Sequence, residues 1–441
     1  MDMPLTVFPA QAPLWGTLTL PGDKSLSHRA ALFAALAEGE SRVENFLLAG
    51  VTRPLLDALT ALGVVWRWEG STLTVVGRGL GGLRAPEVPL NCGNSATTMR
   101  LLAGVLAAAG LPAVLDGSPG LRRRPMRRVT EPLRHMGVPI EDTDGHAPLR
   151  LAARPEGEPL RAITYALPVA SAQVKTALLL AALAARGRTL LREPGPSRDH
   201  TERLLAAMGA PLHRPDRYTV ALEGPLHASL RPLRLTLPGD ISSAAFLLVA
   251  ALLVPGSRVR LRGVLLNPTR TGLLDALQAM GARVKTMPVG EVYGEPVGDL
   301  EVHYTSTLHG ITVAGDLVVR MIDEFPAFAV LAAAAQGDTI VQDAGELRHK
   351  ESDRISALVI QLRALGVAAE ERPDGFVIHG SRHWRGGKVD AHGDHRLAMS
   401  LAVAGLAARE PVTVHGAESV AESFPTFVEA LRSLGATLKE D

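Results

Sequence analysis

One short phrase recurs six times along this chain, and it limits the possible folds more than any other feature. Each copy has apolar residues at helical spacing followed by a glycine, as in LLDALTALGV, and the copies end at Val64, Val138, Ala210, Ala282, Val367 and Ala436. This pattern predicts an amphipathic helix that stops at a left-handed glycine. A strand-like stretch such as VVWRW or RVKTM follows most copies. Because the copies lie roughly seventy to eighty-five residues apart, too far for a solenoid, we expect six βαβαββ-type units.

A second phrase alternates with the first and predicts six buried helices. Its copies are rich in alanine and leucine but begin with polar residues: DKSLSHRAALFAALA, NSATTMRLLAGVLAAAG, ASAQVKTALLLAALAARG, DISSAAFLLVAALLVPG, DEFPAFAVLAAAAQG and GDHRLAMSLAVAGLAARE. Helix N-termini present unpaired amides and the positive end of the helix dipole, so phosphates and carboxylates bind there. The alternative, which we favour for Asp240 and Ser242, is that such residues are ordinary N-caps.

The chain is long enough for two domains. Its 441 residues exceed the length at which one core stops growing, and 46% of them are hydrophobic. The related phrases LPGDKS at 20–25 and LPGDIS at 237–242 indicate where the chain crosses over. We therefore expect a continuous domain over 21–237 and a discontinuous domain made of 1–20 plus 238–441, each an α/β assembly of three repeats.

Charge and cysteine content favour a small ligand over a macromolecular partner. Forty-six basic and forty-five acidic residues leave a net charge of +1, too little for a nucleic-acid or anionic membrane surface. The single cysteine, Cys92, excludes an internal disulfide framework, and neither a targeting segment nor a membrane-spanning run is recognised. We expect a cytoplasmic protein.

Only six of the basic residues are lysines, which makes a lysine within a motif informative, because its ammonium differs chemically from a guanidinium.

Polar motifs open several of the predicted buried helices. PGDKSLSHRA at 21–30 places Lys24, Ser25 and Arg29 at a helix start and resembles a phosphate cradle, although it lacks the first glycine of a Walker loop. NCGNSATTMR at 91–100 supplies small residues past which a ligand could approach the backbone. The arginine run at 122–128 is split by a proline and has no interleaved aromatics, which predicts one anion-binding arginine rather than a nucleic-acid patch.

Carboxylates and cations recur together in the second half of the chain. IDEFP carries Asp323, and HKESDR carries Glu351 together with Lys350 and Arg354, whose spacing of four would place them on one helix face. GDHR, which ends at Arg396, again opens an apolar helix. Surface ion pairs are the structural alternative for each motif. Taken together, the motifs predict a cleft for two small phosphorylated acids and a proton-transfer reaction.

Neither a metal nor a cofactor is expected from these motifs. His392 and His395 lie close together in the sequence, but neither an HExxH motif nor a third ligand accompanies them. The predicted chemistry therefore rests on side chains alone.

In their order, the motifs resemble those of the 5-enolpyruvylshikimate-3-phosphate synthases. The matching segments cover nearly the whole chain: LPGDKSLSHRAALFAALA, GNSATTMRLLAG, LPVASAQVKTALLLAAL, RDHTERLLAAMGA, IDEFPAFAV, HKESDRI and GDHRLAMSLAVAGLA. The resemblance implies the enolpyruvyl transferase fold, with two domains that are each an inside-out α/β barrel of three repeats and an active site in the cleft between them. It also implies a monomer that transfers the enolpyruvyl group of phosphoenolpyruvate to the 5-hydroxyl of shikimate 3-phosphate, toward chorismate and the aromatic amino acids.

Carried over by position, the resemblance assigns substrate contacts to individual residues. Those to shikimate 3-phosphate are Lys24, Ser25, Arg29, Ser171, the amide of Ala172, Gln173, Ser197, Arg198, Asp323 and Lys350. Those to phosphoenolpyruvate are Lys24, Asn94, the chain around Ala96, Arg124, Gln173, Arg354 and Arg396. In this family the 5-hydroxyl adds to C2 of phosphoenolpyruvate while C3 takes a proton, and the adduct then loses phosphate. The resemblance makes Asp323 the candidate base and Glu351 the candidate acid, with Lys24 and Lys350 steadying charge or sharing the proton transfers.

Three positions depart from the commonest pattern of the family. Ala96 stands where many members have glycine, Glu346 where some have asparagine, and Glu422 where some have a lysine that contacts the second ligand. The alanine implies tolerance of glyphosate, because a methyl group would crowd this longer inhibitor more than the substrate.

Two other functions stay open at the level of the sequence. The UDP-N-acetylglucosamine enolpyruvyl transferases share the fold and the chemistry, but they typically carry an AKN motif and a reactive loop cysteine, whereas this chain has DKS and only Cys92. A non-catalytic paralogue that binds phosphorylated ligands or RNA ends is the other alternative. The intact Lys24, Asp323, Lys350 and Glu351 argue against it.

Overall fold

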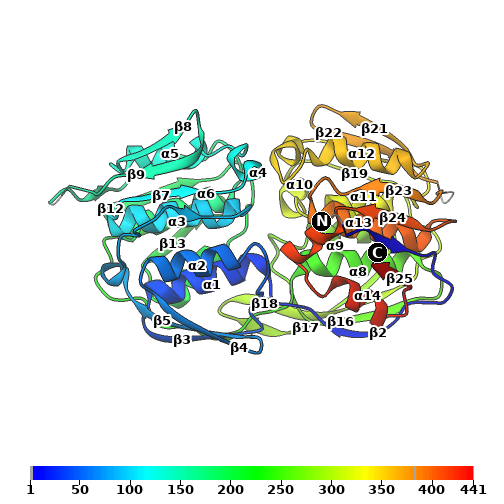
Figure 1. Cartoon of the computed structure of the whole chain (residues 1–441), viewed down its shortest axis with the longest axis horizontal. Helices are drawn as coiled ribbons and strands as arrows, with labels where there is room; N and C mark the ends of the chain where they lie inside the picture. Colours follow the sequence, from blue (N-terminus) through cyan, green and yellow to red (C-terminus); the bar gives the residue numbers. More distant parts are fainter. Residues whose placement is uncertain (1–2, 156, 382–383, 441) are drawn as a thin grey trace. The chain divides into compact units, whose positions relative to one another are not determined.

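The computed structural model describes residues 3–155, 157–381 and 384–440. The chain forms two compact units (Figure 1). Unit 1 contains the N-terminal segment up to Pro21, Pro238–Glu291 and the segment from Pro296 onward, whereas unit 2 contains Gly22–Leu237 and Val292–Glu295. The chain therefore passes between the units beside the LPGDKS and LPGDIS phrases. The inclusion of Val292–Glu295 in unit 2 is a feature that no sequence pattern suggests.

Unit 2 contains three repeats, each with a mixed sheet and at least two helices. The first consists of α1 (Lys24–Leu36), β3 (Glu38–Glu44), α2 (Arg53–Ala61), β4 (Val65–Glu69), β5 (Thr72–Arg78), the short η1 (Leu80–Gly82) and β15 (Arg234–Thr236). The second consists of β6 (Leu90–Asn91), α3 (Ala96–Ala109), β7 (Ala113–Asp116), α4 (Pro119–Arg122), α5 (Arg127–His135), β8 (Ile140–Thr143) and β9 (His146–Leu151). The third consists of β10 (Leu160–Arg161), β11 (Thr164–Ala166), α6 (Ala172–Ala182), β12 (Ala185–Arg192), α7 (His200–Ala207), β13 (Leu212–Asp216) and β14 (Thr219–Gly224).

Unit 1 repeats the same plan with different elements. Its first repeat has β2 (Trp15–Thr19), α8 (Ile241–Leu253), β16 (Arg258–Leu265), α9 (Gly272–Ala279), β17 (Arg283–Val292) and β18 (Glu295–His303). The second has β19 (Thr312–Val313), α10 (Asp316–Arg320), α11 (Phe325–Ala332), β20 (Asp338–Val341), η2 (Gly345–His349), α12 (Arg354–Ala364), β21 (Ala368–Arg372) and β22 (Gly375–His379). The third has β23 (Gly387–Asp390), α13 (His395–Ala407), β24 (Val412–His415), η3 (Ala417–Glu422), α14 (Phe427–Ser433), β25 (Leu438–Glu440) and β1 (Leu5–Val7).

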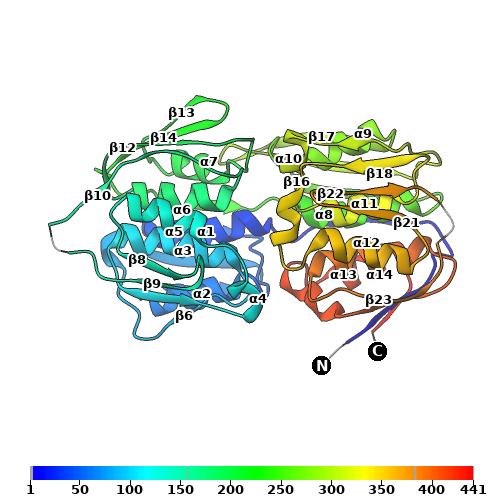
Figure 2. The same ribbon diagram turned by 90° about the horizontal axis from the view of Figure 1, so that it is seen from above.

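All six sheets of the described residues follow one strand order. In the second repeat the order is β6-β7-β9-β8, with β6 parallel to β7 and β9 antiparallel to both of its neighbours. The other orders are β15-β3-β5-β4, β10-β12-β14-β13 with β11 also on β12, β17-β18-β16-β2, β19-β20-β22-β21 and β23-β24-β1-β25. The βαβαββ prediction is therefore confirmed. β1 completes the last sheet between β24 and β25, so the first and the last strand of the chain lie side by side (Figure 2).

One helix of each repeat is buried, which turns each unit inside out relative to an ordinary barrel. Every residue of α8 is buried, and α1, α3, α6, α11 and α13 are buried along most of their length. In unit 2, α3 and α6 run side by side (Figures 1 and 2). The apolar runs of the sequence are thus core helices. No helix in the described part of the chain combines the length and the apolarity that a membrane crossing requires.

The six glycines that end the recurring phrase all have the predicted conformation. Their φ angles are +83°, +89°, +99°, +84°, +83° and +103° for Gly63, Gly137, Gly209, Gly281, Gly366 and Gly435. A side chain at such a φ would be strained, so glycine ends each amphipathic helix and lets the chain turn into the next strand.

Candidate active site

The predicted phosphate cradle lies at the start of α1 in unit 2. Asp23 is the N-cap of this helix, and its carboxylate accepts a hydrogen bond from the Leu26 amide at 2.8 Å. Lys24 is the first helical residue and is half-buried, whereas Ser25 is buried. The motif therefore forms a capped helix start, where amides and the helix dipole favour an anion.

Arg29 lies deeper than its neighbours in the motif. Its guanidinium donates to Ser25 Oγ at 2.7 Å, to Thr201 Oγ1 at 2.8 Å and to Thr176 Oγ1 at 2.8 Å, and the residue is 1% exposed. Burial lowers the pKa of Arg29 to about 10, and the positive charge of Arg198 contributes in the same direction. Arg29 thus connects α1 to α6 and α7, and its guanidinium holds the hydroxyl of Ser25 in place.

The starts of α3 and α6 lie beside the start of α1. Ser95 caps α3 and Ser171 caps α6, and each accepts from an amide three residues on. His28 Nε2 of α1 is 3.3 Å from the Ser95 hydroxyl oxygen. Gln173 Nε2 donates to Thr97 Oγ1 of α3 at 2.8 Å. With the contacts of Arg29, these bonds bring together three helix N-termini in unit 2.

Gln173 is oriented by an arginine that the sequence motifs did not single out. Its Oε1 accepts a hydrogen bond from Arg100 Nη1 at 2.6 Å, and Arg100 Nη2 donates to the Pro125 carbonyl at 2.8 Å. Arg100 is the last residue of the NCGNSATTMR motif, so its place in the motif was the available clue. Ser171, Ala172 and Gln173 are all half-buried.

Of the arginine run, Arg124 is buried, to 8% exposure. Arg122 is exposed and forms an ion pair with Asp116. Nearby, Asn94 Oδ1 accepts a hydrogen bond from the Ser118 hydroxyl at 3.0 Å. Ala96 is the first residue of α3 and is only 2% exposed, so its methyl group is covered by protein atoms.

The segment between β12 and α7 carries Ser197 and Arg198. Ser197 is buried and donates a short hydrogen bond to Glu193, whereas Arg198 is half-buried. Asp199, which follows, is ion-paired with Arg203 at 2.9 Å and with Arg214 at 2.8 Å.

In unit 1, Arg354 is the centre of the second group of predicted residues. It is 1% exposed, and its Nε donates to Asp394 at 2.7 Å while its Nη2 donates to Glu351 at 2.6 Å. Although burial alone would lower the pKa of Arg354, Asp394 and Glu351 raise it above its ordinary value. Burial likewise opposes the ionised form of Asp394, but Arg354 keeps the pKa of this carboxyl below its ordinary value.

Asp323 faces three cations in the same unit. Lys350 Nζ lies 3.6 Å, Arg354 Nη1 3.4 Å and Arg396 Nη2 3.6 Å from its carboxylate oxygens. Asp323 is buried but retains 9% exposure. Asp394 caps α13 and accepts a hydrogen bond from the Arg396 amide at 2.9 Å. The structure therefore brings the predicted carboxylates and cations of unit 1 into one group.

The expectation that Lys350 and Arg354 share a helix face is wrong. Lys350 follows η2 in an extended conformation, and α12 begins only at Arg354 because Asp353 caps it. Their side chains meet at Asp323 through this turn and not through a common helix. The two remaining departures from the family pattern, Glu346 in η2 and Glu422 in η3, are half-buried.

A second buried network at the start of α8 escaped the sequence motifs. Asp240 is an N-cap, as expected, and accepts from the Ser242 amide at 2.7 Å. Ser242 has another role, because its hydroxyl donates to Glu324 and accepts from Arg270 Nη2 at 2.9 Å. Glu324 precedes α11, so this network connects two helix starts of unit 1. An isolated arginine in a loop gave no pattern by which Arg270 could be recognised.

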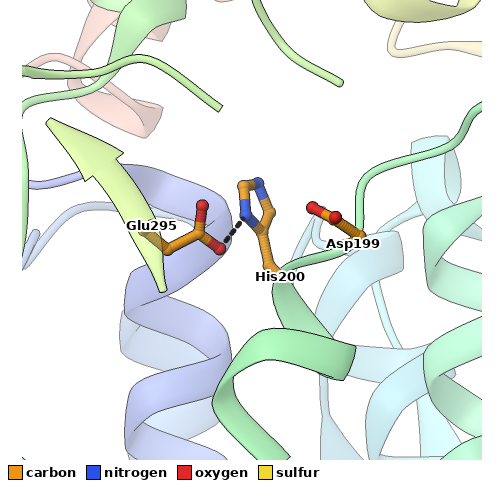
Figure 3. Close-up of side chains that lie close together, drawn as sticks. All are labelled: Asp199, His200 and Glu295. Carbon is orange, nitrogen blue, oxygen red and sulfur yellow. Dashed lines mark hydrogen bonds and ion pairs between the residues drawn. The ribbon is translucent and has the colours of Figure 1, made fainter. Parts of the chain in front are cut away.

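His392 and His395 do not belong to a group with metal-ligand geometry among the described residues, but another cluster has this geometry. Asp199, His200 and Glu295 are buried close together, with His200 Nδ1 2.8 Å from Glu295 Oε1 (Figure 3). The two guanidinium groups on Asp199 already neutralise that carboxylate and would repel a metal cation. The cluster is better explained as structure. It ties the turn between β17 and β18 to the start of α7.

The comparisons with known proteins agree on one family. The family model of EPSP synthase (3-phosphoshikimate 1-carboxyvinyltransferase) matches residues 9–431. A curated 3-phosphoshikimate 1-carboxyvinyltransferase from Halorhodospira halophila is 50% identical over 97% of this chain and 95% of its own length. The one from Methylococcus capsulatus is 48% identical over 96% of each chain.

Solved structures show the same likeness. An EPSP synthase from Acinetobacter baumannii covers 100% of both chains with a TM-score of 0.87 and 40% identity. The enolpyruvyl transferase NikO from Streptomyces tendae has a TM-score of 0.81 at 22% identity, over 100% of this chain and 99% of its own. The likeness to NikO shows a common fold alone.

Proposed function

The chain belongs to the EPSP synthase (3-phosphoshikimate 1-carboxyvinyltransferase) family, and from this membership we propose how its residues share the reaction. It is a transferase of the shikimate pathway, which supplies the aromatic amino acids. It moves the enolpyruvyl group of phosphoenolpyruvate to the 5-hydroxyl of shikimate 3-phosphate and releases phosphate, by addition and then elimination. The observation that carries this conclusion is the family match over residues 9–431.

Asp323 is the base in this proposal. During addition, the oxygen of the 5-hydroxyl forms a bond to C2 of phosphoenolpyruvate, and its proton passes to the Asp323 carboxylate. Support comes from the position of Asp323, which keeps some exposure and faces Lys350, Arg354 and Arg396 at 3.4–3.6 Å. A carboxylate that keeps some exposure beside a bound ligand can take up a proton from that ligand.

Glu351 is the proposed acid. It gives a proton to C3 of phosphoenolpyruvate during addition and takes a proton from the new methyl group during elimination, when the bond between C2 and the phosphate oxygen breaks. The Arg354 guanidinium, 2.6 Å from Glu351, stabilises the carboxylate that is left after the proton transfer. Lys24 and Lys350 stabilise the charge that develops during the reaction. Arg124, Arg354 and Arg396 hold phosphoenolpyruvate and the departing phosphate, together with Asn94, Gln173 and the chain at Ala96.

Shikimate 3-phosphate binds, in this proposal, at the starts of α1 and α6 and at the segment before α7 in unit 2. Ser25, Ser171, the Ala172 amide, Gln173, Ser197 and Arg198 supply contacts from unit 2, and Asp323 and Lys350 supply contacts from unit 1. The capped helix starts support this assignment, because they gather amides, hydroxyls and cations where an anionic ligand is favoured. Arg29 is buried under Ser25, so we assign it to holding that serine in addition to any contact with the ligand.

We also propose that the enzyme tolerates glyphosate and acts as a cytoplasmic monomer. The support for tolerance is the alanine at position 96, at the start of α3. Because Ala96 is only 2% exposed, the effect on an inhibitor would come from the packing of this helix start rather than from an exposed methyl group. The near-neutral charge and single cysteine support the location and leave the monomer as an implication of the family.

The test of this function is inorganic phosphate release from phosphoenolpyruvate with two acceptors in parallel. Release with shikimate 3-phosphate but not with UDP-N-acetylglucosamine is expected. Release with only UDP-N-acetylglucosamine would assign the chain to the cell-wall reaction, and release with neither acceptor would favour a non-catalytic ligand-binding protein. Asp323→Asn, assayed alongside, controls for contaminating enzyme because it should remove the activity.

A further inference from the structure

Beneath the helix starts of unit 2 lies a buried ion network built on Lys175. This lysine is on α6, three residues after the proposed ligand contact Ala172, and it is 1% exposed. Its Nζ is 2.6 Å from Glu193 Oε1 and 2.6 Å from Glu202 Oε1. One ammonium therefore connects the buried helix of the third repeat to the end of β12 and to α7.

Glu193 connects this network to Ser197, which we propose contacts shikimate 3-phosphate. While its Oε1 binds Lys175, its Oε2 accepts the hydroxyl hydrogen of Ser197. The segment around Ser197 has little regular backbone structure: the Glu193 amide donates to the Tyr218 carbonyl at 2.8 Å, and the Ser197 amide donates to the Gly195 carbonyl at 2.9 Å. The chain of contacts from Lys175 through Glu193 to Ser197 is therefore a principal support of this serine.

The network contains charges of both signs. The Lys175 ammonium lies between the carboxylates of Glu193 and Glu202, and Glu202 also interacts electrostatically with Arg29. Burial opposes the charged form of Lys175, but Glu202 and Glu193 raise its pKa above the ordinary value. A buried ion network is a poor way to gain stability, since apolar residues of similar volume often serve as well. The network lies next to Ser197, a proposed contact of shikimate 3-phosphate, which suggests a role in ligand binding.

We propose that Lys175 is a positioning residue for shikimate 3-phosphate, which fixes the Glu193 carboxylate and through it the hydroxyl of Ser197. This inference rests on the proposed function. It assigns Lys175 no contact with a substrate. Loss of the ammonium should therefore weaken use of shikimate 3-phosphate while leaving phosphoenolpyruvate binding nearly unchanged.

Two variants separate positioning from charge balance. Lys175→Met leaves an uncompensated buried negative charge and should lower Tm. Lys175→Met combined with Glu202→Gln removes one charge of each sign and should recover most of that Tm. We expect both to raise KM for shikimate 3-phosphate by about tenfold or more, the scale of a lost hydrogen bond to a charged group. KM for phosphoenolpyruvate should change by less than about twofold. If the double variant regained a normal KM for shikimate 3-phosphate along with its Tm, Lys175 would serve charge balance only and the proposal would be overturned.

Glu202→Gln alone is the matched control. Glu202 Oε2 has no hydrogen-bond partner among the described residues, and a glutamine can still accept from Lys175 through its oxygen. Because this variant leaves the contact between Lys175 and Glu193 intact, it should keep KM for shikimate 3-phosphate within about twofold of wild type. A large rise in this variant would contradict a route through Glu193.

Ser197→Ala shows whether the effect passes through the serine. In that background, the Lys175→Met/Glu202→Gln pair should raise KM for shikimate 3-phosphate far less than in wild type, because the group that it positions is already absent. Equal increases in the two backgrounds would refute the positioning role. The wild-type enzyme tests the proposed function separately. If it releases no phosphate with shikimate 3-phosphate, the proposed function is wrong. If the wild type is active and the variants have a normal KM for shikimate 3-phosphate, only the positioning role of Lys175 is wrong.

Discussion

Asp323 and Asp394 contact the same arginine, and the same substitution should have opposite consequences at the two positions. Asp323 lies 3.4–3.6 Å from three cationic side chains and keeps 9% exposure. Asp394 is fully buried, 2.7 Å from Arg354 Nε, and caps α13. An asparagine has the same shape as an aspartate but neither its charge nor its ability to accept a proton.

Asp323→Asn should remove catalysis and spare the fold. Loss of a general base typically lowers the rate by about 10²–10⁴-fold, so we expect kcat to fall in that range. The three cations lie 3.4–3.6 Å from the Asp323 oxygens, farther than Arg354 Nε lies from Asp394, so the loss of stability should be smaller than the about 3–5 kcal/mol of a tightly bonded buried ion pair. KM for phosphoenolpyruvate should stay the same or fall, because the three cations around Asp323 are left with one negative charge fewer.

Asp394→Asn should instead destabilise the protein. Removal of one partner from a buried ion pair costs about 3–5 kcal/mol, and the retained capping ability of asparagine favours the lower figure. For a domain of this size, about 3 kcal/mol corresponds to a Tm lower by about 6–12 °C. Steady-state kinetics and calorimetry on the two variants measure both effects. Near-normal kcat in Asp323→Asn would remove it from the mechanism, and a Tm loss equal to that of Asp394→Asn would make it a structural residue.

Lys24→Arg keeps the charge but places a larger planar group at the first residue of α1, so kcat/KM should fall by about 10²-fold, the scale of a misplaced catalytic group; wild-type kinetics would contradict a point-charge role. Ala96→Gly should strengthen glyphosate inhibition by about tenfold or more while KM for phosphoenolpyruvate changes little, and equal inhibition of both forms would refute the proposed tolerance. Because Arg354 holds the pKa of Asp394 below its ordinary value of 3.8, the stability that this pair contributes should be fully present above pH 3.8 and be lost as pH falls through the lower pKa of the folded state. Urea unfolding from pH 7 to pH 2 should show the wild type losing its advantage over Asp394→Asn only below about pH 3.8, and a loss already complete at pH 5 would contradict the lowered pKa.

Local sequence patterns predict most of the architecture because each repeat needs the same residue types at its helix starts and helix ends. The glycine after each amphipathic helix, Gly63 for example, must take a positive φ, and the polar residue before each apolar helix, such as Asp23 or Ser95, must cap it. These are requirements of one turn of chain, so a single sequence reveals them. The start of α12 shows the limit of such local evidence: the spacing of Lys350 and Arg354 predicts one helix face, but Asp353 is the N-cap and the helix begins only at Arg354.

What the sequence could not supply depends on distant partners. The depth of Arg29 is set by Thr176 and Thr201 from the third repeat, which no local pattern connects to α1. The inclusion of Val292–Glu295 in unit 2 depends on the pairing of Glu295 with His200, residues almost a hundred positions apart. The scarcity of lysine was a usable clue for Lys175, because a lysine inside the apolar stretch AQVKTALLL has to find buried carboxylates.

The measurement that tests the central claim most directly follows the bridging oxygen of phosphoenolpyruvate, the one between C2 and phosphorus. With this oxygen labelled as ¹⁸O and shikimate 3-phosphate as acceptor, addition and elimination break the bond between C2 and the bridging oxygen. The label should therefore appear in inorganic phosphate, while mass spectrometry finds the enolpyruvyl ether of the acceptor without it. Hydrolysis or phosphoryl transfer would break the bond between phosphorus and oxygen instead. Label retained in pyruvate, with unlabelled phosphate or a phosphorylated acceptor, would contradict enolpyruvyl transfer.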